Sequence, residues 1–122
     1  MIKYIFPIKL PSLNDYVNKC RSHKQAGASF KRKVQDDICW SIKQQGIKKT
    51  KRKVDVKVTF HEANKMRDKD NVISSIKYLM DSLVVMKVIP DDNWQYINQY
   101  DFKVITSNDK KYLVELELHE LD

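Results

Sequence analysis

Apolar and polar residues alternate in four stretches of the chain, at the two-residue period of a half-buried β-strand. These stretches are residues 2–10, 54–61, 96–105 and 112–119. Pro7 interrupts the first stretch and favours an edge strand or the end of a strand. The segment TSNDKK between the last two stretches has the composition of a hairpin loop. The pattern therefore predicts four strands, of which the last two form a hairpin.

Two other stretches carry apolar residues at the spacing of an amphipathic helix. In residues 29–46 an apolar residue recurs every fourth position, Ser29 can cap the start, and Gly46 can close the end. Residues 71–84 show a second stripe of this kind. The segments PSLNDY and VIPDDNW, which lie outside these elements, have the composition of turns.

The predicted order of elements is β-α-β-α-β-β. This order indicates an α+β fold, in which two main helices pack on a small mixed sheet of about four strands. A chain of 122 residues is too short for two domains of ordinary size, so we expect one domain over residues 1–122. Hydrophobic residues make up 42% and charged residues 32%, which is typical of a core beneath a heavily charged surface.

Membrane insertion and disulfide bonding both lack support in the sequence. No apolar run approaches the roughly 20 residues that span a bilayer, and Pro7 and Lys9 interrupt the first apolar stretch before a signal-peptide core could form. We therefore expect no membrane partner and a cytoplasmic protein. Cys20 and Cys39 are too few for a disulfide framework, and we expect both to be reduced thiols.

Positive charge is concentrated in the first half of the chain. Residues 1–53 contain 14 Lys and Arg against 3 Asp and Glu, whereas residues 54–122 contain 9 against 13. The basic half should meet any polyanion that the protein binds. A solvated, solubilising surface explains the same charge equally well, so charge alone leaves the two interpretations open.

Two aspartates, Asp68 and Asp70, stand directly before the second predicted helix. One interpretation is a helix cap, because an Asp at the N-cap position contributes about 1 kcal/mol. A cap needs only one carboxylate, however, and a second one beside it adds repulsion that a cation would relieve. The pair therefore also fits a site for a hard, oxygen-seeking ion such as Mg²⁺.

Further charged residues could complete such a site. Asp91 and Asp92 form an acidic pair in the turn after the second helix, and Lys77 shares a polar stripe of that helix with Asp70 and Asp81. Lys77 and Asp81 also fit a routine helical ion pair. If the turn folds back beside the helix start, the carboxylates and the lysine converge in a group suited to metal-assisted phosphodiester hydrolysis.

Four motifs in this order resemble the RusA family of Holliday junction resolvases, particularly its phage and prophage members. The motifs are PSLNDY, RDKDNV, KYLMDSLV and VIPDDNW. The resemblance extends roughly from Pro11 to Trp94 and is weakest in the last two strands. It implies a small homodimeric, Mg²⁺-dependent endonuclease of the bacterial cell, which cuts four-way DNA junctions with paired symmetric nicks in recombination and repair. Mn²⁺ could substitute for Mg²⁺.

The resemblance also implies roles for individual residues. The first two catalytic, metal-binding aspartates fall on Asp68 and Asp70, the third on Asp92 with Asp91 as the alternative, and the catalytic lysine on Lys77. Three extra residues separate the aspartates from Lys77 relative to better-known members. That insertion is close to one helical turn, so Lys77 can stay on the same face.

The basic residues near these motifs are candidate DNA contacts. Phosphate contacts of Lys and Arg position DNA without reading its sequence. The candidates are Lys31, Arg32, Lys33, Lys65, Arg67 and Lys69. Trp40 and Trp94 could stack on unpaired bases, but both lie in apolar patterns, which favours packing in the core or at an interface.

Two rival functions stay open from the sequence. The first is a non-catalytic, basic DNA-binding adaptor, in which the carboxylates only cap a helix and form a turn. The second is a nuclease that prefers another branched DNA. Metal-dependent cleavage of a junction separates the first rival from a resolvase, and a comparison of substrates separates the second.

Overall fold

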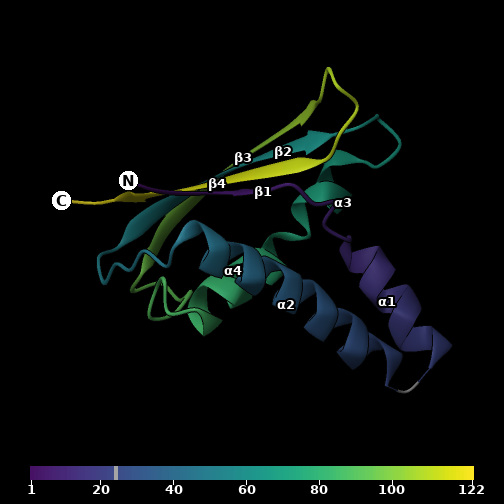
Figure 1. Ribbon diagram of the computed structural model, residues 1–122, viewed down its shortest axis with the longest axis horizontal. Coiled ribbons are helices and arrows are strands. Elements are labelled where there is room, and N and C mark those ends of the chain that lie inside the picture. Colours follow the sequence, from purple (N-terminus) through teal and green to yellow (C-terminus); the bar gives the residue numbers. More distant parts are fainter. Residues whose placement is uncertain (24) are drawn as a thin grey trace.

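A four-stranded mixed sheet carries the helices of this protein on one face (Figure 1). The computed structural model describes residues 1–23 and 25–122. The strands are β1 (Ile2–Phe6), β2 (Val54–Glu62), β3 (Ile97–Thr106) and β4 (Leu113–Glu120). The helices are α1 (Leu13–Ser22), α2 (Ala26–Gln45), α3 (Lys69–Ile73) and α4 (Ile76–Val85). The α+β class and the mixed four-stranded sheet predicted from the sequence are confirmed.

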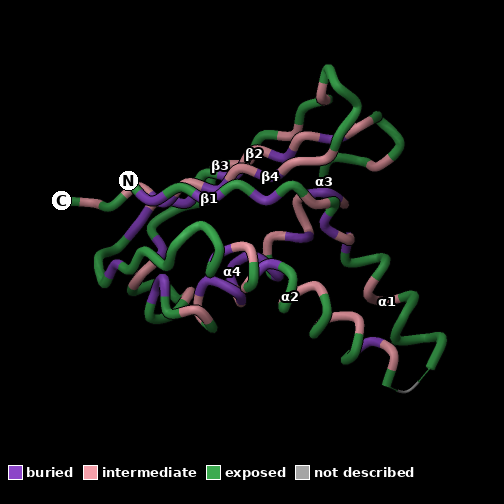
Figure 2. Tube along the Cα trace, in the orientation of Figure 1, coloured by how far each residue is buried: buried purple, intermediate pink, exposed green. Residues whose placement is uncertain are grey.

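The sheet has the order β1-β4-β2-β3. β4 lies antiparallel between β1 and β2, and β3 runs parallel to β2 at the edge. The hairpin predicted from the last two strands was therefore wrong, because β2 lies between β3 and β4 in the sheet. The alternating apolar residues of the strands lie on the face that bears the helices. On this face Leu116 of β4 lies opposite Tyr4 of β1 and Val58 of β2. These three side chains are almost completely buried, and Figure 2 shows buried positions alternating along the strands.

The segment PSLNDY begins a helix rather than forming a turn, so this prediction was wrong. Ser12 is the N-cap of α1: its hydroxyl accepts from the Asp15 amide at 3.2 Å, and the Asp15 carboxylate accepts from the Ser12 amide at 2.8 Å. This reciprocal capping box satisfies two backbone amides that a helix start leaves unpaired. None of the residues Leu13–Ser22 is buried, which explains why no apolar stripe marks α1 in the sequence.

The second predicted helix is divided into α3 and α4 at two serines. The Ser74 hydroxyl donates to the carbonyl of Asn71, and the Ser75 hydroxyl donates to the carbonyl of Val72. Such local side-chain bonds compete with the regular helical ladder. The Ser74 hydroxyl also accepts from the Leu13 amide at 2.9 Å, so the break ties α3 to the start of α1.

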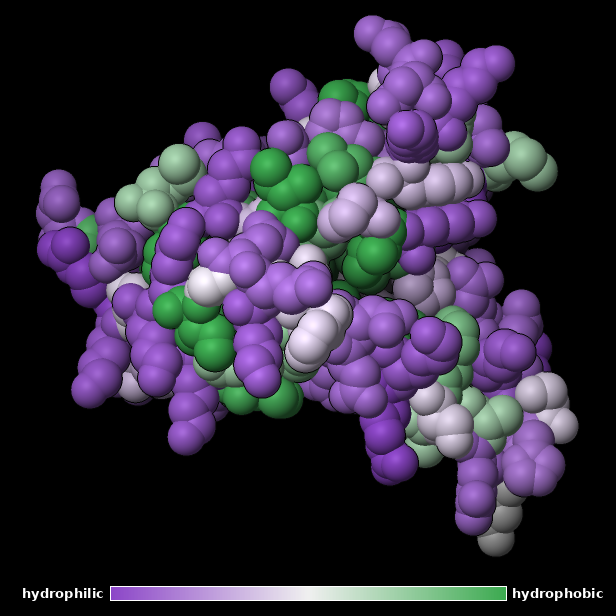
Figure 3. Space-filling model, in the orientation of Figure 1, coloured by the Kyte–Doolittle hydropathy of each residue, from purple (hydrophilic) through white to green (hydrophobic). Residues whose placement is uncertain are grey.

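The helix layer consists mainly of α2 and α4, which pack against each other beneath the sheet (Figure 1). Polar side chains cover most of the face shown in Figure 3, and apolar groups gather where the sheet meets the helices. Cys20 and Cys39 are free cysteines. Within the described ranges, no helix combines the length and the apolar character needed to cross a membrane.

Candidate active site

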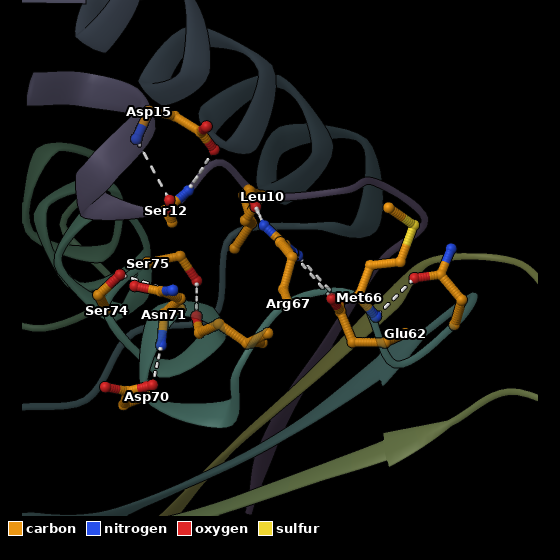
Figure 4. A network of polar contacts seen from close by, with 12 residues as sticks. Leu10, Ser12, Asp15, Glu62, Met66, Arg67, Asp70, Asn71, Ser74 and Ser75 are labelled. Atoms are coloured by element: carbon orange, nitrogen blue, oxygen red, sulfur yellow. Dashed lines mark hydrogen bonds and ion pairs between the residues drawn. The ribbon is translucent and has the colours of Figure 1, made fainter. Parts of the chain in front are cut away.

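Arg67 fixes the loop that leads from β2 to the two aspartates. Its Nε and Nη2 atoms donate to the two carboxylate oxygens of Glu62 at 2.8 and 2.9 Å, and its Nη1 atom donates to the carbonyl of Leu10 at 2.7 Å. Figure 4 shows the guanidinium between these two groups. The loop is thereby fastened both to the end of β2 and to the segment that enters α1.

This pairing changes the role expected for Arg67. Only 17% of the Arg67 side chain and 8% of the Glu62 side chain are exposed, so both charges are largely withdrawn from water. A bidentate pair of Arg with a carboxylate is the geometry in which such burial is best compensated. Arg67 was expected among the DNA contacts, and the structure instead commits its guanidinium to contacts inside the protein.

Asp68 and Asp70 lie at the start of α3, and both are exposed. Asp68 occupies the N-cap position but makes no capping hydrogen bond through its side chain. The Asp70 carboxylate accepts from the amide of Asn71 at 3.0 Å. In residues 1–23 and 25–122, no ion pair involves either aspartate. A helix cap therefore does not account for the Asp68 carboxylate.

Lys77 is the centre of a chain of alternating charges. Its ammonium lies 2.9 Å from an oxygen of Asp81 and 3.2 Å from an oxygen of Asp92. The other oxygen of Asp81 lies 3.6 Å from the ammonium of Lys31 on α2. The turn after α4 thus folds back beside the helix, as the sequence suggested, and brings Asp92 to Lys77 across 15 residues.

These contacts favour the charged form of Lys77. The hydrogen bond with Asp81 is the main cause that raises the pKa of Lys77 above its usual value, and the bond with Asp92 acts in the same direction. The side chain stays 65% exposed. Lys77 is therefore a cation at neutral pH, suited to stabilise negative charge and unsuited to remove a proton.

The two aspartates of the acidic pair have different environments. Asp91 accepts from the amide of Asp92 at 2.7 Å and from the side-chain amide of Asn93 at 3.2 Å, so its carboxylate stabilises the turn itself. Asp92 instead contacts Lys77. The geometry favours Asp92 over Asp91 as the third member of the site.

The expected convergence of three or four carboxylates is not present in the part of the chain that the structure describes. Among residues 1–23 and 25–122, no three His, Cys, Asp or Glu side chains form a group that could hold a metal ion. Asp68 and Asp70 nevertheless supply the type of ligand that Mg²⁺ takes. Protein sites for Mg²⁺ often provide only one or two carboxylates, and waters and substrate phosphates complete the coordination. The donor chemistry of the two aspartates fits such a site.

A basic cavity lies next to Asp68. Its volume is about 540 Å³. Lys65, Lys69 and Asp68 line it, together with the paired Arg67 and Glu62 and the end of β3. Both lysines are exposed. They remain candidates for contacts to a phosphate backbone.

Two of the three candidate DNA contacts on α2 lie in ion pairs. Lys33 lies 3.3 Å from Asp37 in an exposed helical pair, and Lys31 belongs to the chain through Asp81. Arg32 is exposed. Exposed ion pairs contribute little and yield readily to a stronger anion.

The two tryptophans are exposed, so the prediction that they pack in the core was wrong. Packing at an interface stays a prediction. Trp94 is 93% exposed and Trp40 is 59% exposed. Trp94 lines an open cavity of about 290 Å³ with Asp92, Asn98 and Tyr100. Partial burial is the main cause that raises the pKa of Tyr100, and the negative charge of Asp92 acts in the same direction. An exposed aromatic side chain thus stands two residues from Asp92.

Sequence reasoning missed the residues that hold the site together. Glu62 continues the apolar alternation of β2 on its buried face, and a carboxylate at such a position needs a cationic partner. That signal could have identified the pair with Arg67. The side-chain bond between Asn14 and Asn71, at 3.1 Å, had no comparable signal because α1 itself was not predicted.

No protein-family model matches the chain, and no curated protein matches it.

Proposed function

We propose that the protein is an Mg²⁺-dependent endonuclease that resolves four-way DNA junctions, as the resemblance to the RusA family implies. The observation that carries this proposal is the contact between Lys77 and Asp92 at 3.2 Å. Two consecutive motifs, KYLMDSLV and VIPDDNW, meet there through the residues to which the resemblance gives catalytic roles.

The proposed chemistry divides among few residues. Asp68 and Asp70 would hold Mg²⁺, which supplies positive charge for the phosphate and lowers the pKa of a water that attacks it. Lys77, kept protonated by Asp81 and Asp92, offsets the negative charge that develops on the phosphate oxygens. Asp92 keeps the ammonium in place and is the third candidate ligand.

The surface beside these residues suits a nucleic acid. Lys65 and Lys69 line the cavity that contains Asp68, so a phosphate backbone in this cavity would pass the metal site. Lys31, Arg32 and Lys33 extend the positive charge along α2.

Paired symmetric nicks need two such sites, which a homodimer provides. We propose the cytoplasm of a bacterial cell, with a phage or prophage gene as one origin, as the setting.

Cleavage of defined DNA shapes tests this proposal. Purified protein is incubated with a synthetic four-way junction, a linear duplex and a single strand, each with Mg²⁺, with Mn²⁺ or with EDTA. The expected result is paired nicking of the junction that requires the metal. Binding without metal-dependent nicking would favour the DNA-binding adaptor, and stronger cleavage of another branched DNA would replace the junction as substrate.

A further inference from the structure

Strand β3 leaves one long edge of the sheet without a partner strand. It pairs with β2 alone in the described part of the chain, and it is ten residues long, whereas β1 at the opposite edge has five. An unpaired edge presents a row of backbone N–H and C=O groups that can pair with another strand. β3 is therefore the larger of two surfaces on which the sheet could grow.

The side chains of β3 are unusually apolar for an exposed edge. Tyr100, Phe102 and Val104 lie on the helix-bearing face, opposite buried residues of β2. The rings of Tyr100 and Phe102 stack with centroids 5.5 Å apart, and Tyr100 is 41% exposed. On the other face Ile105 is 40% exposed. Soluble proteins usually protect such edges with charged residues or cover them.

The charged residues of β3 complement each other when two copies pair. In an antiparallel pairing with a two-fold axis at Phe102, Asp101 lies opposite Lys103 of the partner subunit, and Tyr100 lies opposite the partner's Val104. Phe102 then meets the partner subunit's Phe102. Directly opposite side chains have Cβ atoms about 4.5–5.5 Å apart, close enough for ion pairs and apolar contact. The strand is thus self-complementary in charge and in apolar character.

We propose that β3 binds β3 of a second copy of this chain in this register. The two sheets then form one continuous sheet with a two-fold axis perpendicular to it, and both helix layers lie on the same face. The residues of β3 alone form this dimer surface. Its use, which places two candidate active sites on one face of a dimer, rests on the proposed function.

Charge reversal tests the register. Sedimentation equilibrium of the full chain without DNA should show a dimer. Asp101→Lys alone would place lysines opposite each other, and Lys103→Asp alone would place aspartates opposite each other. Each should weaken dimerisation at least tenfold, whereas the double variant should restore it because the opposite charges are exchanged. Circular dichroism checks folding, since Asp101 also lies beside Lys57 of β2.

Cysteine cross-linking provides a second measurement. In a background with Cys20→Ser and Cys39→Ser, Phe102→Cys should form an intermolecular disulfide on mild oxidation. Opposite residues of an antiparallel pair have Cα atoms about 4.5–5.5 Å apart, within disulfide range. Ile5→Cys on β1 is the matched control and should not cross-link.

Three outcomes would overturn the proposal. They are a monomeric wild-type chain at 100 μM or so of protein, single variants that dimerise like the wild type, and a folded double variant that stays as monomeric as the single ones. None of them depends on nuclease activity, because all are measured without DNA. A failure of the dimer surface is therefore distinguishable from a failure of the proposed function.

Discussion

The two parts of the candidate active site are held in opposite ways. Asp92 and Lys77 are fixed by ion pairs between their own charged groups, in a chain that continues through Asp81 to Lys31. Asp68 and Asp70 are fixed through the backbone of their loop, which Arg67 anchors, and their carboxylates take no part in an ion pair within the described ranges.

This difference indicates where a cation would gain most. The carboxylate of Asp92 already has a cationic partner at 3.2 Å, so a metal ion there must compete with Lys77. Two neighbouring carboxylates without a cation repel each other, and a divalent ion relieves that repulsion. We therefore expect Asp68 and Asp70 to dominate metal binding and Lys77 to act mainly on the substrate.

The anchor of the loop should give the largest effect on stability. Arg67→Ala leaves the buried carboxylate of Glu62 without its partner, and breaking a buried pair on one side costs about 3–5 kcal/mol. Urea unfolding measures the loss. Lys65→Ala, two residues away on the same loop and exposed, is the control and should stay within about 0.5 kcal/mol of the wild type. Equal stability of the two variants would remove Arg67 as the anchor.

Asp70→Asn should abolish junction cleavage, with a loss of at least about 100-fold, because it removes one of the two proposed metal ligands. Junction binding should stay intact, since no DNA contact is removed. Single-turnover cleavage and a gel-shift titration measure the two effects separately. An Asp70→Asn protein that cuts at the normal rate with Mg²⁺ would refute the site assignment.

Lys77→Ala should separate the two parts of the site. We expect cleavage to fall by about 100-fold, because the cation that faces the phosphate is lost. Metal binding should stay the same or become tighter, since Asp92 loses its competing partner. Calorimetric titration with Mg²⁺ measures this difference, and a clear weakening of Mg²⁺ binding would contradict the assigned division of roles.

The smallest effect is expected from the basic residues of α2. Replacement of Lys31, Arg32 and Lys33 with Ala should weaken binding to all DNA shapes and lower the slope of log K against log salt by about 1 per lost phosphate contact. Arg32 should contribute most, because Lys31 and Lys33 already have carboxylate partners. An unchanged slope would mean that these residues face away from the DNA.

The strands were predictable because each buries one face, which leaves a two-residue period in the sequence. The helix α1 was not, because none of its residues is buried and its capping box of Ser12 and Asp15 resembles a turn. The break between α3 and α4 depends on hydroxyl bonds of Ser74 and Ser75, which an apolar pattern does not record.

The site was predictable only where a short turn determines the contact. The acidic turn was expected to fold back toward the second helix, and the contact of Asp92 with Lys77 agrees with this. The bond of Arg67 to the carbonyl of Leu10 joins residues 57 positions apart, which no local pattern reveals. Trp94 was expected in the core or at an interface because of its apolar neighbours, and its exposure of 93% rules out the core.

Direct titration with a divalent ion tests the central claim, which is that Asp68 and Asp70 form the metal site. Mn²⁺ binding is followed by electron paramagnetic resonance for the wild type, Asp70→Asn and Asp91→Asn, without DNA. Mn²⁺ should bind the wild type and Asp91→Asn alike, Mg²⁺ should displace it, and Asp70→Asn should lose most of the affinity. Equal Mn²⁺ binding by the wild type and Asp70→Asn would contradict this claim.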